Sequence, residues 1–255
     1  MTAVGGRTLE ETPVGRAAFP RLELTEWAER YDLTAGVTLR GEGFSLGLWS
    51  EENVGTVMTR WRAFVHSVQP GFPAVVLGHQ VHGTSVTWHD PFGAGWLIAD
   101  GVDGHATAAS GILLTVTVAD CIPVYLADPK RRAVALLHAG WRGVAGRVLE
   151  MGLKVLREQA GSAPADIVMH CGVGICGSCY EVGPEVLHAL SRPHSPGENH
   201  VDLRLVLVEQ AAQLGIPDVS VSPHCSSCDR RRFFSHRASG GRGGRMVAYL
   251  GSPIA

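Results

Sequence analysis

The chain has 255 residues, of which 45% are hydrophobic and 18% are charged, so it can bury the core of a globular protein. Its formal net charge of −2 provides no overall field that would attract nucleic acid or an anionic membrane surface. No apolar run approaches the roughly 18 residues that a membrane span needs. Six cysteines without an N-terminal export signal are typical of reduced thiols, and we expect a cytoplasmic protein.

The first half of the chain begins with a segment of weak structural signal. Residues 1–18 are rich in Gly, Thr and Glu and predict a loose N-terminal lead-in, whereas residues 19–255 are expected to form a single catalytic domain. The segment 51–68 predicts an amphipathic helix. Two predicted strands, 74–77 and 85–88, flank the sequence GHQVHG.

The second half alternates less regularly between strands and helices. Strands are predicted at 112–118, within 131–140 and at 166–171. Helices are predicted after Gly143, ending at Gly161, and within 201–216. This order predicts an α/β protein, a layered single domain with mixed β-sheets and flanking helices.

Two chemically reactive side chains follow predicted strands. Cys121 comes just after the strand 112–118, and His138 ends the next strand, where HAGWRG turns into a helix. If these strands were parallel neighbours, both side chains would face one crevice at the carboxyl edge of the sheet. His79 or His82 could add a third ligand, and a thiolate with two imidazoles suits a catalytic zinc ion. Inert buried packing of Cys121 is the alternative.

Several strings resemble the laccase-domain family, also called the multicopper polyphenol oxidase-like family. They are QVHG (80–83), ADCIPV (119–124), HAGWRG (138–143), CYEVG (179–183) and FFSHRASGGRGGRM (233–246). The resemblance implies a layered α/β fold with mixed sheets and a zinc site formed by His82, Cys121 and His138. It also implies phosphorolysis of adenosine, inosine, guanosine and methylthioadenosine, together with deamination of adenosine.

The sequence departs from the family pattern in two places. CGVGICGSCYEVG stands where the family usually has Gly-Pro and a Gly-Pro-Cys-Cys-like run. His236, in SHR, replaces the tyrosine of the commoner Ser-Tyr-Arg. These changes affect the expected substrate preference rather than the metal ligands.

Phosphate binding and proton transfer need further residues. Arginine suits phosphate because its planar guanidinium donates two hydrogen bonds at once. Arg142 is the first candidate because it belongs to the His138 turn, with Arg237 and Arg245 behind it. Deamination needs a proton carrier, and Asp103 and Glu181 are the candidates. Asp120 is a weaker candidate, because a strand-like backbone would turn it away from Cys121.

Four other interpretations remain open. A Cys121–His138 pair could be the nucleophile and base of a thiol hydrolase. A copper-dependent polyphenol oxidase is disfavoured because no His-X-His pair occurs, although copper could occupy the zinc site adventitiously.

The other two interpretations concern Cys-X-X-Cys pairs and an arginine–glycine stretch. A structural zinc ribbon of Cys176, Cys179, Cys225 and Cys228 is disfavoured because the 45 intervening residues, 180–224, exceed the usual spacing. An RNA-binding role for GGRGGR is also disfavoured, because the chain as a whole is acidic.

The sequence therefore predicts a zinc enzyme whose partners are purine nucleosides and inorganic phosphate, with no nucleic acid and no membrane. Its oligomeric state is left open.

Overall fold

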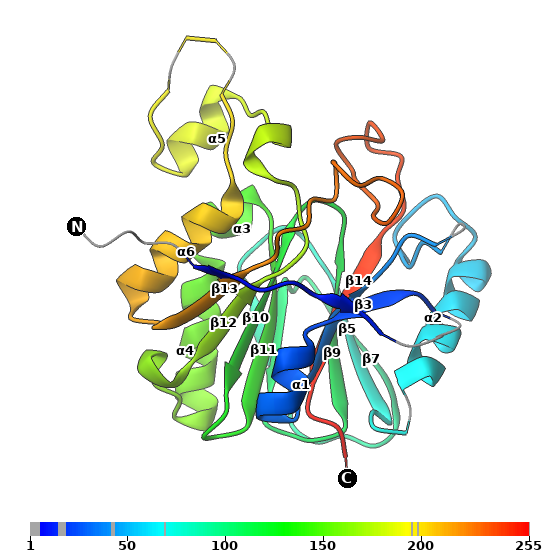
Figure 1. Cartoon of the computed structure of the whole chain (residues 1–255). Coiled ribbons are helices and arrows are strands. Elements are labelled where there is room, and N and C mark those ends of the chain that lie inside the picture. Colours follow the sequence, from blue (N-terminus) through cyan, green and yellow to red (C-terminus); the bar gives the residue numbers. More distant parts are fainter. Residues whose placement is uncertain are drawn as a thin grey trace.

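The computed structural model describes residues 6–14, 19–41, 44–68, 70–194, 196–197 and 199–254. Two mixed β-sheets dominate it (Figure 1). Sheet A has the strand order β1 (Arg7–Thr8), β13 (Asp218–Val221), β12 (Val168–Cys171), β10 (Ile122–Asp128), β11 (Ala133–Ala139), β8 (Gly104–Thr107) and β6 (Val86–Trp88). Sheet B has the order β2 (Thr12–Pro13), β3 (Arg21–Glu23), β4 (Thr34–Thr38), β14 (Met246–Gly251), β9 (Ile112–Val118), β5 (Ala74–His79) and β7 (Gly95–Asp100).

The α-helices of the described residues are α1 (Thr25–Tyr31), α2 (Val54–Val68), α3 (Trp141–Ala145), α4 (Val148–Ala160), α5 (Pro184–Ala189) and α6 (Leu203–Leu214). In Figure 1, α4 and α6 lie on the side of sheet A and α2 lies on the side of sheet B. By contrast, α1 packs Trp27 into the layer between the two sheets. None of these helices has both the length and the apolar character needed to cross a membrane.

Alternation along the strands assigns each side chain to a layer. In β10, Val124 and Leu126 pack toward α4 and α6, whereas Tyr125 and Ala127 pack between the two sheets. Every residue of β10 and β11 is buried, so these central strands are covered on both faces. The result is the layered single α/β domain with mixed sheets that the sequence predicted.

The helix after His138 is interrupted. Gly146 ends α3, and α4 begins after Arg147, whose φ of 67° lies in the left-handed region. Gly161, with a φ of 69°, closes α4, as its position in the sequence indicated. The turn between α3 and α4 was not visible in the apolar periodicity.

The N-terminal segment is more ordered than we expected. Residues 1–5 and 15–18 of the expected loose lead-in lie outside the described residues. Between them, β1 pairs with β13 and β2 pairs with β3. Glu11 is only 1% exposed, and its Oε1 lies 3.1 Å from Nε2 of His170. A buried carboxylate with a hydrogen-bonded partner holds this part against sheet A.

Cys121 and His138 come together by a route other than the parallel pairing considered from the sequence. The strand 112–118 and the strand ending at His138 are not parallel neighbours, because β9 belongs to sheet B and β11 to sheet A. The chain crosses between the sheets over residues 119–121 and continues at once as β10, which pairs with β11 in antiparallel fashion. In the sequence, β10 is not distinguishable as a separate strand.

Candidate active site

Three segments bring one imidazole, one thiol and a second imidazole together. His82 lies in the loop after β5, Cys121 lies at the crossover between the sheets, and His138 lies near the end of β11. Their ligand atoms all lie within 4.8 Å of one another. The two imidazole rings are edge-to-face, with centroids 4.9 Å apart. These are the three residues that the sequence predicted as metal ligands.

The antiparallel pairing of β10 and β11 places Cys121 beside His138. In the register, Ile122 is opposite Ala139 and Pro123 is opposite His138. The start of β10 therefore lies at the end of β11, and the residue just before β10 faces the same space. Asp120 makes the sharp turn at the crossover with a φ of 87°.

Asp103 fixes the positions of both histidines from behind. Its Oδ1 accepts hydrogen bonds from Nδ1 of His138 (2.9 Å) and from the amide of His82 (2.9 Å). Its Oδ2 accepts bonds from the amides of Gly83 (2.6 Å) and Val81 (3.2 Å). Burial alone would raise the pKa of this carboxyl, but the hydrogen bonds of His138 and Gly83 lower it below its ordinary value. Because Asp103 occupies Nδ1 of His138, the other ring nitrogen, Nε2, remains available to bind a metal.

Gln80 and Gly140 complete the support of the site. The side-chain amide of Gln80 donates to the carbonyl of Thr117 (2.9 Å), and its oxygen accepts from the Thr117 amide (2.7 Å). This clamp attaches the His82 loop to β9. A Cβ at Gly140 would lie 3.0 Å from Sγ of Cys121 and 3.2 Å from Cδ2 of His82. Only glycine fits at this position without moving a ligand.

The electrostatics favour a thiolate at Cys121. Burial alone would raise the pKa of the thiol, but the charge of His138 and hydrogen bonds from His138 and His82 lower it to about 6. Burial alone would lower the pKa of His138, but the Cys121 charge and the Asp103 hydrogen bond raise it to about 9. Without a metal, the pair therefore favours a thiolate beside a protonated imidazole.

A cavity of about 590 Å³ opens over these three residues. This volume lies within the range of small-molecule sites. The side chains of Arg142, Arg237 and Arg245 all line it, as do those of Trp49 and Tyr180. The three arginines that the sequence predicted for phosphate binding thus share one cavity with the predicted metal ligands.

The three arginines are held in different ways. The guanidinium of Arg142 lies over the Trp141 ring, 4.3 Å from its centroid, and among the described residues no carboxylate pairs with it. Arg237 donates from its backbone amide to Oδ2 of Asp120 (2.7 Å) and from its side chain to the carbonyl of Glu181 (2.7 Å). Arg245 donates to the carbonyls of Gly243 and Gly244, so part of its donor capacity is already used.

The two expected proton carriers do not line the cavity. Both oxygens of Asp103 are engaged, and its side chain is fully buried behind His138. The side chain of Glu181 is exposed, and its backbone carbonyl holds Arg237. Both residues make positioning contacts, Asp103 through its carboxylate and Glu181 through its backbone carbonyl.

Several cavity residues were not predicted from the sequence. Trp49 stacks on His79 with ring centroids 4.6 Å apart, and Nδ1 of His79 lies 2.7 Å from Oδ1 of Asp100. Tyr180 forms another part of the wall. Burial, aided by the Cys121 charge, raises its pKa to about 12, so its phenol keeps its proton. Of these, His79 lies next to QVHG and Tyr180 lies within CYEVG, whereas Trp49 had no signal in the sequence.

Asp120 lines the cavity, but its carboxylate is engaged. Its Oδ1 accepts a hydrogen bond of 2.6 Å from Ser226, and its Oδ2 accepts from the Arg237 amide. The strand-like backbone that we expected at Asp120 is absent, because its φ of 87° turns the side chain at the crossover. Asp120 therefore connects the segment that contains Arg237 to the crossover between the sheets, where Cys121 lies.

Comparisons with known proteins identify relatives that are named as enzymes. A purine nucleoside phosphorylase, YlmD, of Geobacillus stearothermophilus is 37% identical over 59% of this chain and 60% of its own length. An adenosine deaminase, RL5, from an unknown prokaryotic organism is 35% identical over 57% of this chain and 60% of its own. The match thus spans about 60% of the length of each relative.

The fold is similar to solved structures over nearly all of the chain. The crystal structure of YlmD from Geobacillus stearothermophilus superposes with a TM-score of 0.85 at 28% identity, covering 94% of this chain and 98% of that one. The family model described as multi-copper polyphenol oxidoreductase laccase matches residues 34–252, which include all three predicted ligands. The chain belongs to this laccase-like family.

Proposed function

We propose that this protein is a zinc-dependent purine nucleoside phosphorylase that also deaminates adenosine. Its substrates would be adenosine, inosine, guanosine and methylthioadenosine, each with inorganic phosphate. The observation that carries the proposal is the joint placement of a His-Cys-His group and three arginines around one cavity. The printed names of the two relatives, a purine nucleoside phosphorylase and an adenosine deaminase, support it.

The three side chains fit a zinc ion. A thiolate and two imidazoles are ligands that zinc prefers, and three protein ligands are typical of catalytic rather than structural sites. The Asp103 hydrogen bond to His138 matches the usual support of a metal-bound histidine by a carboxylate. The ion would supply Lewis acidity at its open coordination position.

The arginines supply the anion-binding part of the cavity. In phosphorolysis a phosphate oxygen bonds to C1′ of the ribose, the bond from C1′ to the purine nitrogen breaks, and its electron pair leaves with the purine. Arg142 has a guanidinium without a carboxylate partner among the described residues, so it can donate to phosphate and neutralise its charge. Arg237 and Arg245 add positive charge to the same wall.

Aromatic and protic side chains suit the purine. Trp49 is 49% exposed and stacked on His79, and Tyr180 presents a protonated phenol. A purine can stack on an exposed aromatic face, and a phenol can donate a hydrogen bond to a ring nitrogen. Deamination also needs a proton carrier, and we place it on His79 or His236, the other imidazoles that line the cavity.

The decisive assay is phosphate-dependent release of hypoxanthine from inosine by zinc-loaded protein. We expect release that saturates with phosphate and is absent without it. Arg142→Ala should raise the KM for phosphate by about tenfold or more, because a hydrogen bond to a charged group contributes ~1.5–3 kcal/mol. Arg157→Ala, an exposed arginine on α4, is the matched control and should leave the KM unchanged. No release at any phosphate concentration would exclude the phosphorylase.

One observation favours a second function, that of a thiol hydrolase. Cys121, His138 and Asp103 lie in the order of a nucleophile, a base and an orienting carboxylate, and the Cys121 pKa is lowered to about 6. A thiol hydrolase would work after chelation and would be inactivated by iodoacetamide. The zinc enzyme would lose activity with a chelator and regain it with zinc.

Copper-dependent oxidation of phenols has less support, despite the description of the family model. Multicopper oxidases need several histidine-rich clusters. Among the described residues, the His82–Cys121–His138 group is the sole metal-capable cluster that contains a histidine. We expect no oxidation of phenols by the zinc-loaded protein, although copper could replace zinc because it binds such ligands more tightly.

A further inference from the structure

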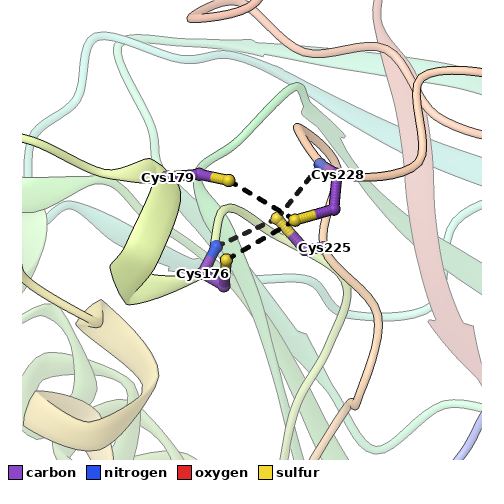
Figure 2. A group of neighbouring side chains, drawn as sticks. All are labelled: Cys176, Cys179, Cys225 and Cys228. Atoms are coloured by element: carbon purple, nitrogen blue, oxygen red, sulfur yellow. Dashed lines mark hydrogen bonds between the residues drawn. The ribbon is translucent and has the colours of Figure 1, made fainter.

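Four other cysteines meet outside the cavity site. Cys176 and Cys179 lie in the loop after β12, and Cys225 and Cys228 lie in the loop after β13. Figure 2 shows the four thiols converging from the two loops. Their sulfur atoms all lie within 4.8 Å of one another, as a group separate from His82, Cys121 and His138. The long interval disfavoured a zinc ribbon of these cysteines in the sequence, but the structure brings the two pairs together.

The topology of sheet A brings the two pairs together. β12 and β13 are parallel neighbours, so their carboxyl ends lie at the same edge, although α5 and α6 lie between them in the sequence. Beyond the strands, Gly174 and Cys225 continue the pairing as an isolated parallel bridge. The usual spacing of zinc ribbons applies when both cysteine pairs lie close together in the sequence. It does not detect two pairs that are brought together by the pairing of distant strands.

The sulfur distances match a metal site better than a disulfide. Sγ of Cys228 lies 3.4 Å from Sγ of Cys179 and 3.9 Å from Sγ of Cys176. A disulfide bond would require about 2.05 Å. Four thiolates around zinc at about 2.3 Å stand about 3.8 Å apart along each edge of a tetrahedron. The observed distances lie on either side of that value.

Backbone amides already face one of the sulfurs. Sγ of Cys225 accepts hydrogen bonds from the amides of Cys176 (3.2 Å) and Cys228 (3.4 Å), which Figure 2 draws as dashed lines. Amide donors stabilise the negative charge of a thiolate. The first bond crosses from one loop to the other, so the donors that favour an ionised sulfur come from both pairs.

The N-terminus of α6 fixes both loops without a metal. Asp202 accepts a hydrogen bond of 3.2 Å from the amide of Gly177, between the first two cysteines. The buried guanidinium of Arg204 donates to the carbonyls of Ser222 and His224, just before the second pair. Because these contacts do not involve sulfur, the loops can approach before any ion binds.

We propose that Cys176, Cys179, Cys225 and Cys228 form a structural zinc site, distinct from the cavity site. Four protein thiolates fill a tetrahedral coordination shell, which leaves no position for a substrate. The site would lock two loops that border the cavity: Tyr180, which lines it, follows Cys179 directly, and Ser226 donates a hydrogen bond to the cavity residue Asp120. The thiolates need reducing conditions, which agrees with the expected cytoplasmic location.

Metal analysis by mass spectrometry of the purified, reduced protein tests the proposal. We expect two zinc ions per chain, and one in the double variant Cys176→Ser/Cys228→Ser. Cys171→Ala, which removes the buried cysteine of β12, is the matched control and should retain two. His82→Ala should lose the other zinc ion. A single zinc ion that disappears only in His82→Ala would overturn this inference while leaving the proposed function intact.

A second measurement does not depend on folding of the cysteine variant. Cobalt loaded into His82→Ala should show the intense sulfur-to-metal absorption of a tetrathiolate site. A cobalt spectrum without these bands, iron in place of zinc, or a disulfide joining the two pairs in reduced protein would each overturn the assignment. Hydrogen exchange in residues 172–183 and 223–238 should be faster after zinc removal, and unchanged exchange would contradict the structural role.

Discussion

Gly140 leaves the space that the metal ligands occupy. A methyl group at this position would lie 3.0 Å from the Cys121 sulfur and 3.2 Å from the His82 ring. We predict that Gly140→Ala displaces a ligand at a cost of ~1–3 kcal/mol, the usual penalty for overpacking, and lowers zinc affinity about tenfold or more.

Chelator competition measures this affinity, and Gly93→Ala is the control. No atom lies within 4 Å of a Cβ at Gly93, so that variant should bind zinc like the wild type. Equal affinities for all three proteins would show that the crowding around Gly140 does not constrain the ligands.

Asp103 acts on the chemistry through His138 and the His82 loop. We predict that Asp103→Asn lowers zinc affinity by about 10–100-fold, the range found when a carboxylate behind a metal-bound histidine is removed. An asparagine has one acceptor oxygen for four donors that now point at the carboxylate. Glu181→Gln should bind zinc normally, because that side chain is exposed. Normal affinity in Asp103→Asn would mean that the backbone alone orients His138.

At the residue scale, the sequence indicates which side chains are chemically suited to a site, but it does not indicate where those side chains point. Cys121 and His138 stood out because a thiol and an imidazole at the ends of apolar runs are unusual, whereas the choice of His82 over His79 came from the resemblance to the laccase-domain family. Asp103 and Glu181 were assigned to proton transfer because the sequence cannot show where a carboxylate points. Trp49 was missed because no sequence pattern tells whether an aromatic residue in a loop lines a cavity or packs in the core.

At the element scale, the segment around Glu11 docks the N-terminus onto sheet A. Burial alone would raise the pKa of Glu11, but the hydrogen bonds from His170 and Ser222 lower it below its ordinary value of 4.5. A carboxyl with a lowered pKa stabilises the folded state above its unfolded pKa, and the stabilisation is lost as the pH falls through the folded-state pKa.

We predict that Glu11→Gln lowers the free energy of unfolding by ~1–3 kcal/mol at pH 7, because a charged hydrogen-bond partner is lost. The difference from the wild type should shrink as the pH falls below about 4.5. Urea denaturation at pH 7 and at a pH below about 4.5 measures the free energy of unfolding of both proteins. Glu10→Gln, a substitution of the exposed neighbour, should differ little from the wild type at either pH. A pH-independent gap in Glu11→Gln would contradict the assigned cause.

Elements were predicted well where periodicity is local. β9 was found with its observed bounds, and α2 and α6 lie within the predicted segments. β10 was missed because only three residues separate it from β9, so the two strands read as one apolar run. The meeting of the four cysteines was missed for another reason: it depends on the pairing of β12 with β13, a contact between segments far apart in sequence.

At the scale of the whole molecule, both proposed metal sites lie where the chain leaves sheet strands. Cys121 marks the passage from sheet B to sheet A, and His138 lies beside it through the β10–β11 pairing. The layered fold followed from composition and the mixture of elements. The sequence could not predict which of the two sheets each strand joins, because apolar strands such as β9 and β11 are equally suited to either sheet.

The position of β14 has a consequence for synthesis of the protein. β14 (Met246–Gly251) lies between β4 and β9 in the middle of sheet B, although it comes after all the other described strands in the sequence. A nascent chain on the ribosome therefore holds an unfinished sheet B until β14 has been synthesised. A stop codon at position 246 should yield aggregated, protease-sensitive polypeptide, whereas one at position 254 should yield folded protein. Pulse proteolysis of the two truncated products would distinguish these fates.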